Sequence, residues 1–193
     1  MKIQANKVDD FIKNIDNKIR GVLIYGPDEG LVLIRKNEIL QKLLPDYKNS
    51  LSLITISNAT IKDKPNIINN EYNSSSLFSS DKKILLIEDA ENSISKILEE
   101  IFSKTQNSEN FIVITAGDLD SKSTLKRFAE YNQYFASLPC YKDDINAIMQ
   151  IINLKLRKEG FKYNADVVKY LTESFGGNRL IILCELDKLI TYK

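Results

Sequence analysis

The sequence predicts an α/β fold, a doubly wound parallel sheet of five strands, followed by a small all-α unit of three helices. Over the first two-thirds of the 193-residue chain, short β-branched runs alternate with segments of helical period. Such alternation is typical of a parallel sheet with right-handed crossovers. The runs are apolar almost throughout rather than at every second residue, which indicates strands that are buried on both faces.

Five short segments are expected to form the strands. Between them, apolar residues recur at helical spacing, first from Leu31 to Leu43 and then from Ile94 to Phe102. Each helical segment would form the crossover between two parallel strands. The expected strands are Gly21–Tyr25, Leu51–Ile56, Lys83–Glu88, Phe111–Ala116 and, as the weakest candidate, Tyr134–Pro139.

The last quarter of the chain differs in character, because it contains three helical segments and no expected strand. The first runs from about Asp144 to Lys158, and the second starts at a capping Asn164 and stops at Gly176-Gly177. The third begins at Asn178. We therefore place a boundary near Tyr141, between a domain of residues 1–140 and a helical domain of residues 141–193. The third helix is expected to bury one stripe, Leu180, Leu183, Leu186 and Ile190.

Composition excludes several classes of function. The chain has no histidine, so Ser-His and Cys-His nucleophile pairs and most zinc sites are excluded, and we expect no catalytic residue, no metal and no cofactor. The two cysteines, Cys140 and Cys184, are far apart in the sequence and fit a reduced protein. No apolar stretch approaches the ~18 residues of a membrane span, and no signal peptide is recognisable. We expect a cytoplasmic protein without a membrane partner.

The segment after the first strand has the outline of a phosphate-binding loop but lacks its chemistry. A Walker loop needs a lysine for the β and γ phosphates and a hydroxyl for magnesium. Leu31 and Val32 stand at those two positions, the loop is too short, and its two acidic residues would repel a triphosphate. The residues of this degenerate loop are Gly26, Pro27, Asp28, Glu29 and Gly30.

Two further strand ends carry polar residues that allow two interpretations each. Glu88-Asp89 follows the third strand as the acid pair of a Walker B strand does, in reversed order; alternatively, both are exposed carboxylates at the sheet edge. Thr115 on the fourth strand is either the remnant of a γ-phosphate sensor or a structural residue. Downstream, Ser121 is expected to cap a helix whose basic residues Lys122, Lys126 and Arg127 either contact DNA phosphate or form a solvated face.

Five stretches together resemble the delta subunits of the bacterial DNA polymerase III clamp loader. In that family the first domain is an AAA+ module with a degenerate, non-hydrolysing nucleotide site, a helical lid follows, and a third domain builds a collar. The resemblance implies an AAA+-like fold for residues 1–140 and a lid for residues 141–193, with the collar domain absent from this chain. The matching stretches are IRGVLIYGPDEGLVLIRK, SLFSSDKKILLIEDAE, TAGDLDSKSTLKRF, ASLPCYKDD and GGNRLIILCELDKL.

The same resemblance implies a clamp-binding element before the third strand, formed by a hydrophobic residue, a spacer and Leu-Phe. Its positions here are Ser75, Leu77 and Phe78, so a serine replaces the first apolar anchor. Leu77 and Phe78 are also the only large apolar pair in a polar stretch, as expected of an interface anchor. The alternative is that both side chains fasten the end of the helix to the sheet.

The family implies a function in DNA replication. We expect a subunit of the DNA-directed DNA polymerase (nucleotidyltransferase) holoenzyme that binds and opens the beta sliding clamp, without a catalytic activity of its own. The implied partners are the beta clamp, the gamma/tau and delta prime subunits, and primed DNA only within the assembled loader. Two alternatives stay open: a small NTPase that uses Glu88-Asp89 with magnesium, and an adaptor for an unrelated protein.

Overall fold

The computed structural model describes residues 1–74, 82–104, 109–175 and 178–192. Its centre is a five-stranded sheet with the order β2-β3-β4-β1-β5, and all neighbouring strands are parallel. This confirms the predicted doubly wound α/β fold. The strands are β1 (Gly21–Tyr25), β2 (Leu53–Ile56), β3 (Ile84–Ile87), β4 (Phe111–Ala116) and β5 (Phe135–Pro139).

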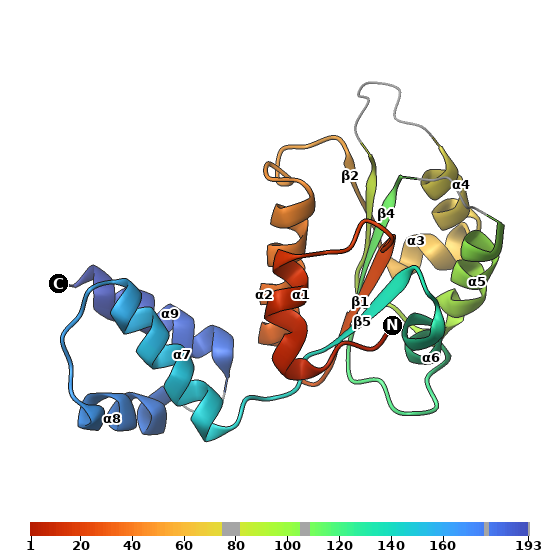
Figure 1. Ribbon diagram of the computed structural model, residues 1–193. Coiled ribbons are helices and arrows are strands. Elements are labelled where there is room, and N and C mark those ends of the chain that lie inside the picture. Colours follow the sequence, from red (N-terminus) through yellow and green to blue (C-terminus); the bar gives the residue numbers. More distant parts are fainter. Residues whose placement is uncertain (75–81, 105–108, 176–177, 193) are drawn as a thin grey trace.

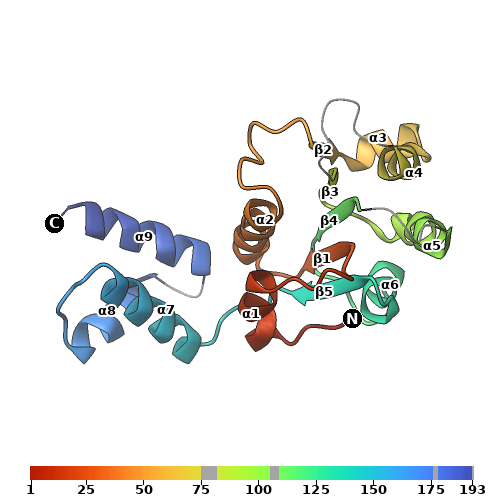
Figure 2. The same ribbon diagram turned by 45° about the horizontal axis from the view of Figure 1, so that its top comes forward.

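Helices cover both faces of the sheet (Figures 1 and 2). One layer contains α1 (Val8–Lys13), preceded by a 3₁₀ turn (Ala5–Lys7), and the long α2 (Glu29–Leu43). The opposite layer follows β2, β3 and β4 in the chain. Its members are α3 (Asn58–Asp63), α4 (Ile67–Asn73), a 3₁₀ turn (Asn92–Ile94), α5 (Ser95–Lys104) and α6 (Thr124–Tyr131).

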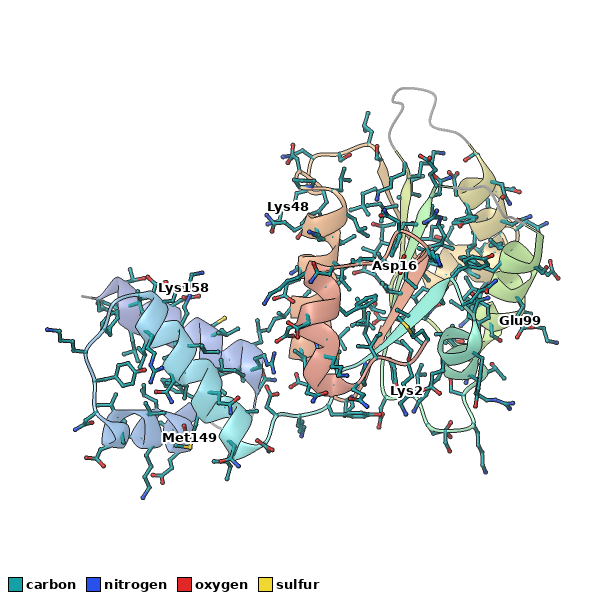
Figure 3. The ribbon with its side chains drawn as sticks, viewed as in Figure 1. Lys2, Asp16, Lys48, Glu99, Met149 and Lys158 are labelled. Carbon is teal, nitrogen blue, oxygen red and sulfur yellow. The ribbon has the colours of Figure 1, made fainter. Side chains whose placement is uncertain are left out.

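The strands are buried on both faces, as their continuous apolar sequences predict. Along β1, Val22 and Ile24 join the apolar cluster under α1 and α2, whereas Leu23 and Tyr25 join the cluster under the other layer. Side chains fill the space between the sheet and both helix layers (Figure 3). The second cluster contains the aromatic residues Tyr72, Phe102, Phe128 and Phe135, whose neighbouring ring centroids lie 5.2–6.1 Å apart.

The last three helices, α7 (Ile145–Lys158), α8 (Ala165–Phe175) and α9 (Arg179–Thr191), enclose an apolar cluster of their own. Each begins at an acidic or amide side chain that accepts a hydrogen bond from the helix's third backbone N–H. The bonds run from Ala147 to Asp144 (2.8 Å), from Val167 to Asn164 (3.1 Å) and from Ile181 to Asn178 (3.1 Å). These caps satisfy N–H groups that have no partner within a helix.

The expected apolar stripe on α9 is only half right. Leu186 is buried as predicted, but its partner one turn earlier is Ile182, which the stripe omitted. Leu180 instead lies against the β1–α2 loop, where its Cβ would be 2.9 Å from a Cβ on Gly30. The helix therefore divides its apolar residues between the core of α7–α9 and the sheet unit, which a single stripe cannot describe.

Within the described residues, no helix combines the length and the apolarity that a membrane crossing needs.

Candidate functional site

In the β1–α2 loop, the side chain of Asp28 folds back onto the backbone at the start of α2. Asp28 is the N-cap of α2, and one of its carboxylate oxygens accepts a hydrogen bond from the Leu31 backbone N–H at 2.9 Å. The residue is only 3 % exposed, and its other carboxylate oxygen is buried without a hydrogen-bond partner. A negative charge next to a helix N-terminus is favourable. The acid that the sequence places in the loop is therefore a helix cap.

Backbone bonds fasten the same loop to neighbouring strand ends. The Gly26 N–H donates to the Gly117 carbonyl at 3.1 Å, and the Asp28 N–H donates to the Cys140 carbonyl at 3.2 Å. Gly26 has φ +149°, and a Cβ there would lie 2.2 Å from the Cys140 carbonyl oxygen. A phosphate cradle needs successive N–H groups that point at the ligand. Here two of those N–H groups are used inside the protein.

The N-terminus of α9 packs against the start of α2 at Gly30. A Cβ on Gly30 would be 3.0 Å from the Asn178 side-chain oxygen and 3.3 Å from the capping oxygen of Asp28, so both polar groups lie close over this glycine. A cavity of about 390 Å³ remains beside them. It is lined by Pro27, Asp28, Glu29, Lys142 and Asn178.

The segment after β3 is also held within the protein, Glu88 through its side chain and Asp89 through its backbone. Glu88 forms an ion pair with Lys36 of α2, with 2.7 Å between carboxylate oxygen and ammonium nitrogen. The Asp89 N–H donates to the Thr115 hydroxyl at 3.2 Å, and the Ala90 N–H donates to the Thr115 carbonyl at 2.8 Å. This favours the structural interpretation of Thr115. Among the described residues, no three Cys, Asp or Glu side chains are grouped to hold a metal ion.

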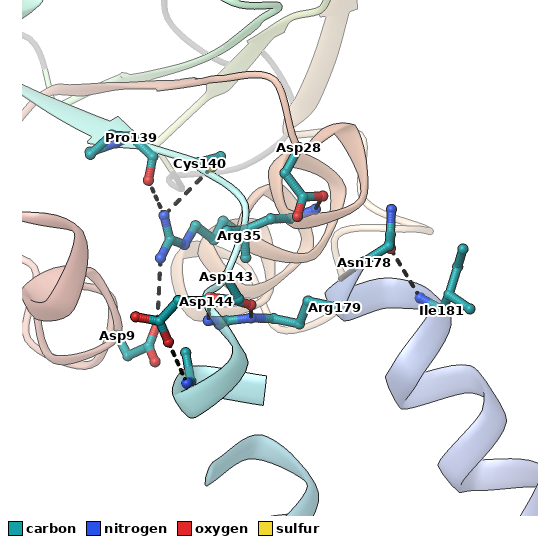
Figure 4. A network of polar contacts seen from close by, with 12 residues as sticks. Asp9, Asp28, Arg35, Pro139, Cys140, Asp143, Asp144, Asn178, Arg179 and Ile181 are labelled. Atoms are coloured by element: carbon teal, nitrogen blue, oxygen red, sulfur yellow. Dashed lines mark hydrogen bonds and ion pairs between the residues drawn. The ribbon is translucent and has the colours of Figure 1, made fainter. Parts of the chain in front are cut away.

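Two arginines form polar contacts around the connection between the sheet unit and α7–α9 (Figure 4). Arg35 of α2 is buried, donates to the Pro139 carbonyl at the end of β5 and lies 4.0 Å from an Asp9 carboxylate oxygen. Arg179 of α9 donates two hydrogen bonds of 2.7 Å to the Asp143 carboxylate in the connection before α7. This bidentate pair raises the pKa of Arg179. The pair fixes the start of α9 to the connection between β5 and α7.

The two cysteines are both free, but their environments differ. Cys140 is fully buried, and burial raises the pKa of its thiol to about 11, although the neighbouring Arg35 acts in the opposite direction. Cys184 on α9 is exposed. Since the thiolate is the reactive form, the two thiols should be distinguishable by their rate of reaction.

We expect the native chain to react at pH 8 with one equivalent of an aromatic disulfide reagent, at Cys184. Only about one part in a thousand of Cys140 is thiolate at that pH, and access is blocked as well. The second equivalent should react after unfolding in denaturant. Cys184→Ser should remove the fast phase, whereas Cys140→Ser should leave the fast phase unchanged. Two fast thiols in the folded chain would contradict the burial of Cys140.

Other residues singled out in the sequence lie apart from the loop. The N-cap of α6 is Ser123, whose hydroxyl accepts from the Lys126 N–H at 3.2 Å, so the prediction of Ser121 is wrong by two residues. The Lys126 ammonium donates to the Leu119 carbonyl and lies 5.1 Å from the centre of the Tyr25 ring. Ser75, Leu77 and Phe78 lie outside the described residues.

Comparison with known proteins identifies the family. A sequence profile described as DNA polymerase III, delta subunit, matches residues 22–138. The chain belongs to this family. It is 31 % identical over 183 residues to the probable DNA polymerase III subunit delta of Rickettsia prowazekii (strain Madrid E), covering 91 % of this chain and 51 % of that protein. The chain thus spans about half the length of that relative.

Solved structures share the AAA+-like fold with this delta-family chain. The Bacillus subtilis DNA clamp loader delta protein superposes with a TM-score of 0.69 at 12 % identity, over 98 % of this chain and 57 % of that one. AMPPCP-bound DnaA from Aquifex aeolicus gives 0.53 at 19 % identity, over 100 % of this chain and 63 % of that one. At these identities the similarity establishes the fold.

Sequence reasoning missed the residues that close the site. Arg35 and Lys36 appeared only as polar members of a helix, and Asp143 and Arg179 are 36 positions apart. Their spacing gives no signal, because the contacts form only when α2, β5 and α9 come together. The outline of the loop was visible in the sequence; the side chains that occupy it were not.

Proposed function

We propose that this chain is the part of a clamp-loader delta subunit that binds and opens the beta sliding clamp for loading onto primed DNA. Membership of the delta family over residues 22–138 is the observation that supports this proposal most directly. We further propose gamma/tau and delta prime subunits as the other partners, a cytoplasmic location, and a division into domains at residues 1–140 and 141–193. The separate apolar cluster of α7–α9 supports that division.

The proposal assigns clamp contact to Leu77 and Phe78, with Ser75 at the first anchor position. The described residues on either side of this segment are held close together. The Asn110 side chain donates to the Tyr72 carbonyl at 2.7 Å and accepts from the Lys83 N–H at 2.8 Å. Lys83 also donates to the Ser74 hydroxyl at 2.8 Å. These bonds hold the described residues before and after the proposed element beside one another.

The chain is proposed to act by binding alone, without hydrolysing a nucleotide. Ring opening requires only that the chain binds the open clamp more tightly than the closed one. The structure of the loop supports this role, because Asp28 caps α2 where phosphate would bind and Lys36 is paired with Glu88. These contacts argue against the small-NTPase alternative, which needs free N–H groups for phosphate and a lysine that is free to reach it.

The test measures binding of the purified chain to the beta clamp by calorimetry, with and without ATP and magnesium. We expect saturable binding that nucleotide leaves unchanged, and no heat from nucleotide alone. Ser75→Met should tighten clamp binding, since it restores an apolar anchor, whereas the matched control Ser76→Met in the spacer should not. Absence of clamp binding, or a requirement for ATP, would overturn the proposal.

A further inference from the structure

The C-terminal turn of α4 is capped by a side chain from the start of another element. A helix leaves its last four carbonyl groups without a partner inside the helix. α4 ends at Asn73, and the side-chain amide of Asn110 donates to the Tyr72 carbonyl at 2.7 Å and to the Ser74 carbonyl at 3.4 Å. Asn110 directly precedes β4, so the donors for this turn come from the sheet.

The same amide also bonds the residue before β3. An asparagine side chain carries both a donor and an acceptor. The acceptor of Asn110, its side-chain oxygen, takes the Lys83 N–H at 2.8 Å. The Lys83 carbonyl in turn accepts from the Phe111 N–H, the first of β4, at 2.9 Å. One side chain therefore joins the end of α4 to the starts of two neighbouring central strands.

The Lys83 side chain adds a second bond between the same turn and the sheet. Its ammonium donates to the Ser74 hydroxyl at 2.8 Å and lies 3.5 Å from a Glu71 carboxylate oxygen. The Lys83 side chain is 13 % exposed, so these contacts are largely shielded from water. Hydrogen bonds from a charged group are stronger than neutral ones, and shielding strengthens them further.

The polar residues of the α4 turn also bond within the helix. The Asn73 amide donates to the Asn69 side-chain oxygen at 2.7 Å, and the Ser74 hydroxyl donates to the Glu71 carbonyl at 3.0 Å. Bonds of this kind shape the turn but do not fix it to the sheet. The contacts with Asn110 and Lys83 do so, because both residues belong to the starts of strands.

We propose that Asn110 and Lys83 are positioning residues for clamp binding. They fix the last turn of α4, and the chain continues from that turn into the positions assigned to clamp contact. If the turn were loose, binding would first have to order it, and that ordering would lower the affinity. The inference rests on the proposed function and deepens it, since it assigns part of the clamp affinity to two residues outside the assigned contact.

The test compares variants that remove these bonds with one that removes similar bonds elsewhere. Asn110→Ala removes the donor and the acceptor together, and Lys83→Met removes the ammonium but keeps an unbranched side chain. The matched control is Asn92→Ala. The Asn92 side-chain oxygen accepts from the Ser123 hydroxyl at 2.6 Å and from the Leu125 N–H at 3.2 Å, which joins a 3₁₀ turn to α6 in the same helix layer. Urea denaturation establishes that each variant is folded.

By calorimetric titration of the beta clamp, we expect Asn110→Ala to bind about tenfold more weakly than the unaltered chain, and Lys83→Met about threefold more weakly. Asn92→Ala should bind as the unaltered chain does. In the Leu77→Ala background the loss from Asn110→Ala should be smaller, because a residue that acts through the clamp contact is coupled to it.

Four results would overturn the inference. Unchanged affinity in folded Asn110→Ala and Lys83→Met would do so and leave the proposed function standing. An equal loss in Asn92→Ala would reduce the effect to general destabilisation. A full tenfold loss in the Leu77→Ala background would make the contribution of Asn110 independent of the assigned contact. Absence of clamp binding by the unaltered chain would overturn this inference together with the proposed function. If Asn110→Ala does not fold, Lys83→Met and its loss in the Leu77→Ala background decide the matter.

Discussion

Alanine at both Leu77 and Phe78 should weaken beta-clamp binding by about thirtyfold for each side chain, at least ~2 kcal/mol per residue. The reason is that an aliphatic and an aromatic anchor together supply most of the apolar area that such a short element can bury in a partner. The free energy of unfolding should barely change, because side chains that contact only a partner contribute little to folding. Calorimetric titration of the clamp and chemical denaturation of the same variants measure the two quantities.

The matched control is the double variant Leu51→Ala with Tyr131→Ala. Leu51 is 87 % exposed and Tyr131 is 83 % exposed, so this pair removes the same kinds of side chain from the surface at sites outside the proposed element. Clamp affinity should survive. If Leu77 and Phe78 instead fasten α4 to the sheet, Phe78→Ala alone should lower the free energy of unfolding by ~3–5 kcal/mol, with clamp affinity unchanged in the refolded variant. That result would refute the clamp-binding role.

The sheet could be predicted from sequence because its strands are locally distinctive. The observed bounds of β1 and β4 coincide with the predicted ones, Gly21–Tyr25 and Phe111–Ala116. The prediction for β2 began two residues early, at Leu51, whose side chain is almost fully exposed. Hydrophobicity alone places Leu51 in the strand, yet parallel pairing starts where Leu53 meets Ile84. Strand ends depend on a neighbour that is distant in sequence.

The sequence predicted which phosphate-binding residues the candidate site lacks, but it did not predict which side chains occupy the site. The missing lysine and hydroxyl were readable from Leu31 and Val32. That Asp28 turns inward as a cap, and that Lys36 reaches Glu88 across 52 positions, depends on tertiary contacts. From the sequence, the two acidic residues of the loop were interpreted only as groups that would repel a triphosphate. The structure adds that one of these charges is stabilised by the helix that it caps.

Gly26 is required by the backbone conformation and close packing of the β1–α2 loop, and not only by a phosphate-loop pattern. Gly26→Ala should therefore lower the free energy of unfolding by about 2–6 kcal/mol. About half of this comes from forcing a side chain into a backbone conformation with φ +149°. The other half comes from the clash of the new Cβ, 2.2 Å from the Cys140 carbonyl oxygen. That oxygen cannot withdraw easily, because it accepts the Asp28 N–H and the Cys140 N–H is bonded to Tyr25. Urea denaturation followed by circular dichroism measures the change.

Two other glycines separate the two contributions. Gly160 has φ +74° but nothing within 4 Å of an added Cβ, so Gly160→Ala should cost only the backbone strain, about 1–2 kcal/mol. Gly117 has neither a positive φ in that range nor a close neighbour, and Gly117→Ala should change stability by less than about 1 kcal/mol. If Gly26→Ala cost no more than Gly160→Ala, the loop would be free to move away from β5. The close approach that keeps the Gly26 and Asp28 N–H groups from a phosphate would then be a weak preference rather than a constraint of the fold.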